Sequence, residues 1–136
     1  MLSWSRCGLG LLCFDLGELE AARVHVEESL KLSRKGGEKP EEGKSMVALG
    51  RIIGKADPSQ SARAEGLILD GIKMLEELGH KPFQAEGYLR LGEFYPDAGR
   101  KQDALQALNK AKRMFQEMGM EYWLAKADRA LKKLEG

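Results

Sequence analysis

The chain has 136 residues, of which 43% are hydrophobic and 32% charged, and its formal net charge is +1. This composition is ordinary for a soluble globular protein, and the length suits one domain with one continuous core. The balanced charge provides no global field that would attract nucleic acid or an acidic membrane, so we expect neither as a partner. Cys7 and Cys13 are the only cysteines, which fits a reducing compartment or simple core filling, and we expect a cytoplasmic protein.

The first segment, MLSWSRCGLGLLCFDLG, contains an apolar run that has to be weighed as a signal sequence. Only Arg6 precedes the run, no small-residue cleavage site follows it, and it is too short to span a bilayer. We therefore interpret the segment as a core helix. A start cut from a longer chain is the alternative interpretation.

Three Leu-Gly pairs, at residues 9–10, 49–50 and 91–92, are separated by 40 and then 42 residues. Each pair is followed by the same series of residue types at nearly constant spacing. The series consists of an alanine (Ala22, Ala64, Ala104), an apolar residue (Val26, Ile68, Leu108), a small residue (Ser29, Gly71, Ala111) and a glycine (Gly37, Gly79, Gly119). Self-similarity at a period of tens of residues indicates stacked structural units.

The repeats divide the chain into three two-helix units, at about residues 2–37, 41–79 and 82–119, followed by a lone helix over 120–135. The first unit turns at Asp15-Leu16-Gly17, and the second turns at residues 55–60, which makes its turn two residues longer. The lone helix has a polar face, as the end of a helical stack requires. We therefore predict an all-α protein of one domain with seven helices, because no segment alternates apolar and polar residues as a half-buried strand does.

The third unit has the clearest pattern. In its second helix, five apolar residues recur at steps of four and three and so share one helical face: Ala104, Leu108, Ala111, Phe115 and Met118. Gly119 then predicts a left-handed helix end. In its first helix, Gly92 sits at a position where glycine costs about 1 kcal/mol relative to alanine, which indicates that another backbone comes close.

These residues resemble the tetratricopeptide repeat family. The motif that carries the resemblance is Tyr88-x-x-Leu91-Gly92-x-x-Tyr95, followed by Ala104, Leu108 and Ala111. The family's usual unit has about 34 residues and closes with proline, whereas Arg34, Glu76 and Gln116 stand at that position here. The period of 40–42 residues is similar to the long-helix variants in bacterial regulators and motor-cargo adaptors. The resemblance implies an α-solenoid of three helix-turn-helix repeats with a C-terminal capping helix.

By this resemblance, the first helix of each unit lines a concave groove, on the face opposite the Leu-Gly stripe. The predicted groove residues are Trp4, Gly8, Leu11 and Asp15 in the first unit, Lys44, Ala48, Arg51 and Lys55 in the second, and Glu86, Arg90, Glu93 and Asp97 in the third, with Lys126 and Lys133 added by the cap. This groove is expected to be apolar at one end, basic in the middle and mostly acidic beyond. The alternative for each residue is the solvated face of an amphipathic helix.

We therefore expect a non-catalytic interaction module, or adaptor, that binds a peptide or helix of a partner protein in the groove. A second hypothesis is a homodimer that buries the end of the stack around Trp4. Tryptophan is also enriched at binding hot spots, so Trp4 is equally a candidate anchor for a partner. A third is the regulatory tail of a larger bacterial signalling protein. The family's carboxylate clamp is not expected, because the only asparagine, Asn109, lies on a second helix.

Catalytic and metal chemistry are not expected from this sequence. His25 and His80 are the only histidines, and neither has a zinc-like spacing with Cys7 or Cys13. The glycines recur at predicted helix crossings and ends rather than in a phosphate-binding loop. We therefore predict no enzyme activity, no metal and no cofactor.

Overall fold

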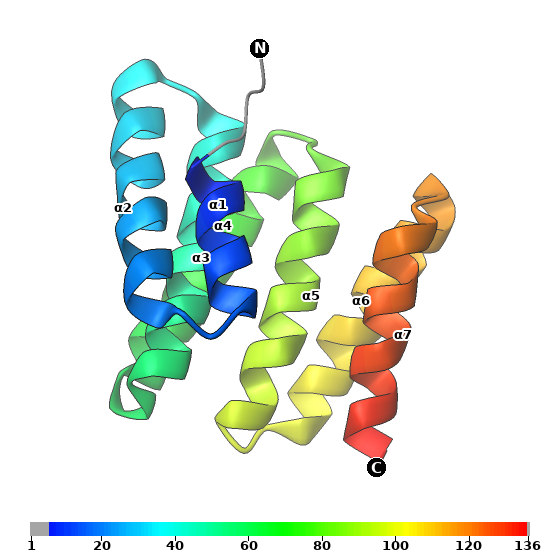
Figure 1. Cartoon of the computed structure of the whole chain (residues 1–136). Coiled ribbons are helices and arrows are strands. Elements are labelled where there is room, and N and C mark those ends of the chain that lie inside the picture. The colour runs from blue at the N-terminus through cyan, green and yellow to red at the C-terminus, as the bar shows by residue number, and fades with distance from the viewer. Residues whose placement is uncertain (1–5, 136) are drawn as a thin grey trace.

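The structure is a computed structural model that describes residues 6–135, and over this range it is all-helical (Figure 1). The prediction of an all-α fold with seven helices is confirmed for these residues. The helices are α1 (Arg6–Asp15), α2 (Leu19–Gly36), α3 (Lys39–Ala56), α4 (Ser61–Glu77), α5 (Lys81–Asp97), α6 (Lys101–Met118) and α7 (Glu121–Glu135), with a short 3₁₀ turn, η1 (Pro58–Gln60), before α4.

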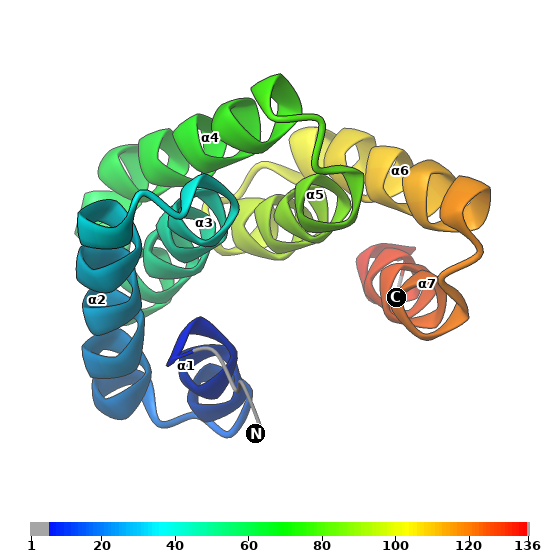
Figure 2. The ribbon, with the colours of Figure 1, turned by 90° about the horizontal axis from the view of Figure 1, so that it is seen from above.

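The helices form two layers that curve into an arc. Seen from above, α2, α4 and α6 follow the outside of the arc, while α1, α3, α5 and α7 lie on its inside (Figure 2). Each helix packs against the next one along the chain, and the inner helices also contact one another in the order α1, α3, α5, α7. The two ends of the inner layer, α1 and α7, face each other across the concave side (Figure 2).

The glycines of the three Leu-Gly pairs occupy matching surroundings. A Cβ atom added to Gly10 would collide with Val26, and one added to Gly92 would collide with Leu108. A Cβ added to Gly50 would lie 2.7 Å from both the Ala64 carbonyl oxygen and Ile68 Cγ1. The three apolar partners belong to one column of the repeat pattern. The glycines therefore let the two helices of each pair cross closely, as the sequence predicted for Gly92.

The second helix of the third pair ends as predicted. Gly119 has a φ of 68°, in the left-handed region that favours glycine. Its N–H donates to the Gln116 carbonyl oxygen at 3.2 Å, which satisfies one of the carbonyl groups left open at the end of the helix.

The two ends of the arc differ in how their apolar side chains are covered. At one end α7 covers α6, where Phe115 is fully buried and its ring stacks on Trp123 with centroids 5.9 Å apart. At the other end Leu12 is 50% exposed, although the residues at the equivalent positions, Ile52 and Phe94, are 0% and 1% exposed. Phe94 is covered because its ring lies against Gly54 of the preceding pair, whereas α1 is the first helix of the arc (Figure 2).

Candidate functional site

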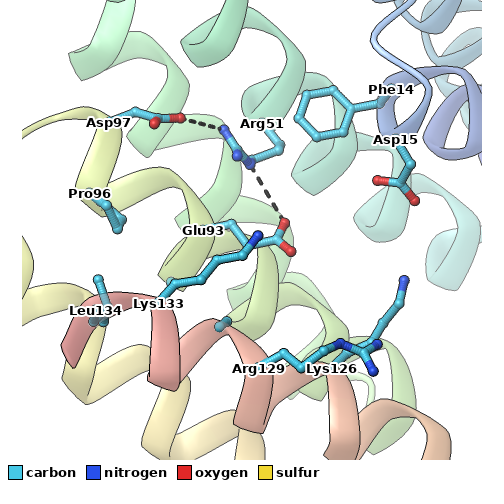
Figure 3. Close-up of a pocket in the computed structure, with 12 residues that line it drawn as sticks. Phe14, Asp15, Arg51, Glu93, Pro96, Asp97, Lys126, Arg129, Lys133 and Leu134 are labelled. Carbon is cyan, nitrogen blue, oxygen red and sulfur yellow. Dashed lines mark hydrogen bonds and ion pairs between the residues drawn. The ribbon is translucent and has the colours of Figure 1, made fainter. Parts of the chain in front are cut away.

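A hollow of about 450 Å³ lies on the concave side, between α7 and the other inner helices (Figure 3). Side chains from α1, α3, α5 and α7 line it. They are Phe14, Asp15, Arg51, Glu93, Pro96, Asp97, Lys126, Arg129, Ala130, Lys133 and Leu134, together with Gly92. The stacking of the inner helices therefore brings together residues that are far apart in the sequence.

Arg51 of α3 forms the floor of the hollow. Its Nη1 donates to Asp97 Oδ2 at 3.0 Å, and its Nε lies 3.7 Å from Glu93 Oε1, with both carboxylates on α5 (Figure 3). The guanidinium group stacks over the Phe14 ring at 4.9 Å from the centroid. Arg51 is only 7% exposed, and its Nε–H is buried with no hydrogen-bond acceptor among the described residues.

Arg90 of α5 ties the first and third helix pairs together. Its Nη1 donates to Glu93 Oε1 at 3.2 Å and to Asp15 Oδ1 of α1 at 3.4 Å. Its guanidinium carbon lies 5.9 Å from the Phe14 ring centroid. Burial by itself would lower the pKa of Arg90, but the carboxylates of Glu93 and Asp15 raise that pKa above its ordinary value. Arg90 therefore stays charged and holds α1 against α5.

The wall of the hollow formed by α7 carries three cations at spacings of three and four residues: Lys126, Arg129 and Lys133. Within residues 6–135 none of the three forms an ion pair. Lys126 Nζ lies over the Trp123 ring at 5.2 Å. The lining thus contains four cations, counting Arg51, and three carboxylates, and all three carboxylates already pair with Arg51 or Arg90. Arg129 and Lys133 therefore have no acidic partner among residues 6–135, whereas Lys126 is close enough to Glu86 for its charge to lower the pKa of that carboxyl.

A smaller depression lies nearer the N-terminal ends of α3 and α5. Its lining includes Leu11, Lys44, Phe83, Glu86 and Arg90. Lys44 Nζ sits over the Phe83 ring at 4.5 Å. Burial raises the pKa of Glu86, and the nearby charges of Lys44, Arg90, His80 and Lys126 only partly oppose this rise.

The raised pKa of Glu86 predicts a pH dependence of stability. An acid whose pKa is raised on folding lowers the stability as pH rises above its ordinary value of 4.5, because ionisation is then harder in the folded state. We expect the Glu86→Gln variant to gain stability relative to the original chain as the pH rises above 4.5, because glutamine does not ionise. Urea unfolding at several pH values measures this difference, and a difference independent of pH would contradict the assignment.

The structure distributes the predicted groove residues over both surfaces. Asp15, Arg51, Glu93 and Asp97 line the hollow with Lys126 and Lys133, whereas Leu11, Lys44, Ala48, Glu86 and Arg90 line the smaller depression. Lys55 is exposed and lines neither surface. Trp4 lies outside the described residues.

Ion pairs join the predicted basic segment to the predicted acidic segment at Arg51, whereas Lys44 and Lys55 form no ion pair within residues 6–135. Arg51 of α3 pairs with Asp97 and Glu93 of α5, and Arg90 pairs with Asp15 and Glu93, so the two buried arginines are neutralised by carboxylates of α1 and α5. Because these pairs form between neighbouring inner helices, the charge of one helix face alone does not give the charge of the assembled surface. Among the cations that line the hollow, those that form no ion pair within residues 6–135 are Lys126, Arg129 and Lys133 of α7.

Among the charged and aromatic residues of the lining, Arg129 and Phe14 were not predicted from the sequence. Arg129 completes the row between Lys126 and Lys133, and its spacing of three from one and four from the other is the signal that could have identified it. Phe14 contacts both buried arginines. No repeat pattern identifies Phe14, because the equivalent positions hold Gly54 and Pro96.

No group of three or more His, Cys, Asp or Glu side chains within residues 6–135 is placed to hold a metal ion. None of the helices in the described range combines the length and apolar character that a bilayer crossing requires. Neither a protein-family model nor a curated protein matches the chain.

Proposed function

We propose that this protein is a non-catalytic interaction module of the tetratricopeptide type, which holds a peptide or helix of a partner protein in the concave hollow. The observation that carries the proposal is the hollow itself, about 450 Å³ in volume and lined by charged side chains from α1, α3, α5 and α7. A concave surface with a few convergent polar groups is the usual form of a binding site. The balance of charge and the two free cysteines support a place in the cytoplasm.

The experiment that tests the proposal compares capture of cellular proteins by two double variants. Lys126→Glu with Lys133→Glu reverses charge in the hollow, whereas Lys73→Glu with Lys101→Glu reverses charge at exposed sites of α4 and α6 on the outer layer. We expect the hollow variant to lose a partner that the original chain and the outer variant both retain, because charge across an interface governs partner choice. Equal capture by both variants, with unchanged helicity, would exclude the hollow as the binding surface.

A homodimer through the α1–α2 end is a second candidate function. Leu12, Leu16 and Leu32 are 50%, 69% and 48% exposed at this end, and Ile52 shows that the position of Leu12 is buried where a preceding pair is present. Because α7 already covers the opposite end, two copies would have to meet head to head through this apolar face.

The dimer candidate predicts that Leu12→Glu changes the oligomeric state. Because Leu12 is half-exposed, a glutamate there remains hydrated and should leave the monomer folded. Burying the same carboxylate in a dimer interface would be unfavourable. We expect multi-angle light scattering over a concentration series to show the original chain dimerising and Leu12→Glu remaining monomeric. A monomeric original chain at high concentration would rule the dimer out.

A further inference from the structure

We propose that the segment bound in the hollow is an acidic helix, which lies alongside α7 and places carboxylates against Lys126, Arg129 and Lys133. This inference rests on the proposed function and specifies the chemistry of the partner. It is carried by two observations on opposite sides of the hollow. The row of cations on α7 forms no ion pair within residues 6–135, and the buried Nε–H of Arg51 has no hydrogen-bond acceptor there.

The charges of the hollow favour an anionic ligand. All three carboxylates of the lining are already engaged by Arg51 or Arg90, so they do not compensate the wall formed by α7. Like charges three and four residues apart on one helix repel one another, and the row therefore weakens α7 slightly unless acids lie against it. A cationic or apolar ligand would leave this repulsion in place, whereas carboxylates would remove it.

The spacing of the cations favours a helical ligand. Residues 126, 129 and 133 follow the 3.6-residue period and form one row along α7. A second helix alongside α7 presents a matching row when its acids occur at spacings of three and four. The volume of about 450 Å³ accepts the side chains of one helical face, with the helix body over the opening.

Arg51, at the floor of the hollow and across it from α7, offers a buried hydrogen-bond donor. The Nε–H of Arg51 has no hydrogen-bond acceptor in the described part of the chain, and Glu93 Oε1, with which the Nε forms an ion pair, is 3.7 Å away. A buried donor without an acceptor costs about 1–3 kcal/mol. The Glu93 side chain is 31% exposed, so it can move aside when a ligand carboxylate enters between Phe14 and α7 and accepts from the Arg51 Nε–H.

The test uses two fluorescein-labelled, alanine-rich helical peptides of equal length. One carries three glutamates at positions i, i+4 and i+7, and the other carries glutamines at the same positions. We expect fluorescence anisotropy to show the glutamate peptide binding at least about 10-fold more tightly than the glutamine peptide, with an affinity that falls as salt is raised. Equal binding of the two peptides, or no binding of the glutamate peptide, would overturn the proposal.

Matched variants locate the binding. Lys126→Gln, Arg129→Gln and Lys133→Gln together are expected to remove the preference for glutamate, whereas Lys31→Gln, Lys73→Gln and Lys101→Gln, which lie at exposed sites of α2, α4 and α6, should retain it. If both triple variants lost the preference for the glutamate peptide equally, the attraction would be a nonspecific charge effect and the proposal would be contradicted. In ¹⁵N NMR spectra, the Arg51 Nε–H signal should shift with the glutamate peptide only.

The two proposals fail in distinguishable ways. A cellular partner that requires the hollow but binds independently of salt and of its own acidic residues would overturn the acidic-helix inference and leave the binding function intact. A glutamate peptide that binds with the same affinity to the charge-reversed hollow variant would remove the hollow from both proposals.

Discussion

Gly50→Ala is expected to lower the free energy of unfolding by about 1–3 kcal/mol, although alanine is the better helix former. The added Cβ would lie 2.7 Å from the Ala64 carbonyl oxygen and 2.7 Å from Ile68 Cγ1. Since the carbonyl oxygen belongs to the backbone of α4, the contact can be relieved only by moving α4 away from α3. Urea unfolding followed by far-UV circular dichroism measures the loss.

Gly66→Ala is the matched control for this substitution. Gly66 lies within α4, and an added Cβ meets no atom within 4 Å. The same chemical change should therefore raise the stability by about 0.5–1 kcal/mol, through reduced backbone freedom of the unfolded chain. A stabilising Gly50→Ala would contradict the close crossing of α3 and α4.

Phe94→Ala is expected to lower the free energy of unfolding by about 3–5 kcal/mol, the usual range for removing a buried aromatic side chain. Phe94 is 1% exposed, and its ring lies against Gly54, so its loss leaves a cavity between the second and third helix pairs. Differential scanning calorimetry of the variant should show a correspondingly lower midpoint of unfolding.

Leu12→Ala tests the same position of the repeat at the uncovered end. Leu12 stands two residues after its Leu-Gly pair, as Phe94 does, but it is 50% exposed. We expect the free energy of unfolding to fall by less than about 1 kcal/mol in dilute solution, because much of the Leu12 side chain is already exposed to water. A loss as large as that for Phe94→Ala would mean that Leu12 is covered.

The repeat columns were enough to predict the helices and their crossings. Gly50 and Ile68 stand in columns that recur three times, and the geometry requires this recurrence because each helix pair crosses at the same point. The sequence carries that information locally, since the residues of one crossing are fewer than 20 positions apart. The left-handed end at Gly119 was readable for the same reason.

The charge pairs of the hollow could not be predicted in this way. The pair of Arg90 and Asp15 joins residues 75 positions apart, and that of Arg51 and Asp97 joins residues 46 positions apart. Their meeting depends on how far the inner helices rotate from one pair to the next, which no column of the repeat specifies. Lys126 and Lys133 were placed correctly because the row along α7 is local, whereas the neutralisation of Arg51 was not foreseen.

Site-specific photo-crosslinking tests most directly whether the hollow holds a partner. Benzoylphenylalanine is introduced at Ala130, which lines the hollow, or at Gln106, which is exposed on α6 of the outer layer. We predict that irradiation in cells of origin links a partner protein to position 130, through an acidic segment identified by mass spectrometry, and not to position 106. Crosslinks at position 106 without any at position 130 would contradict the account.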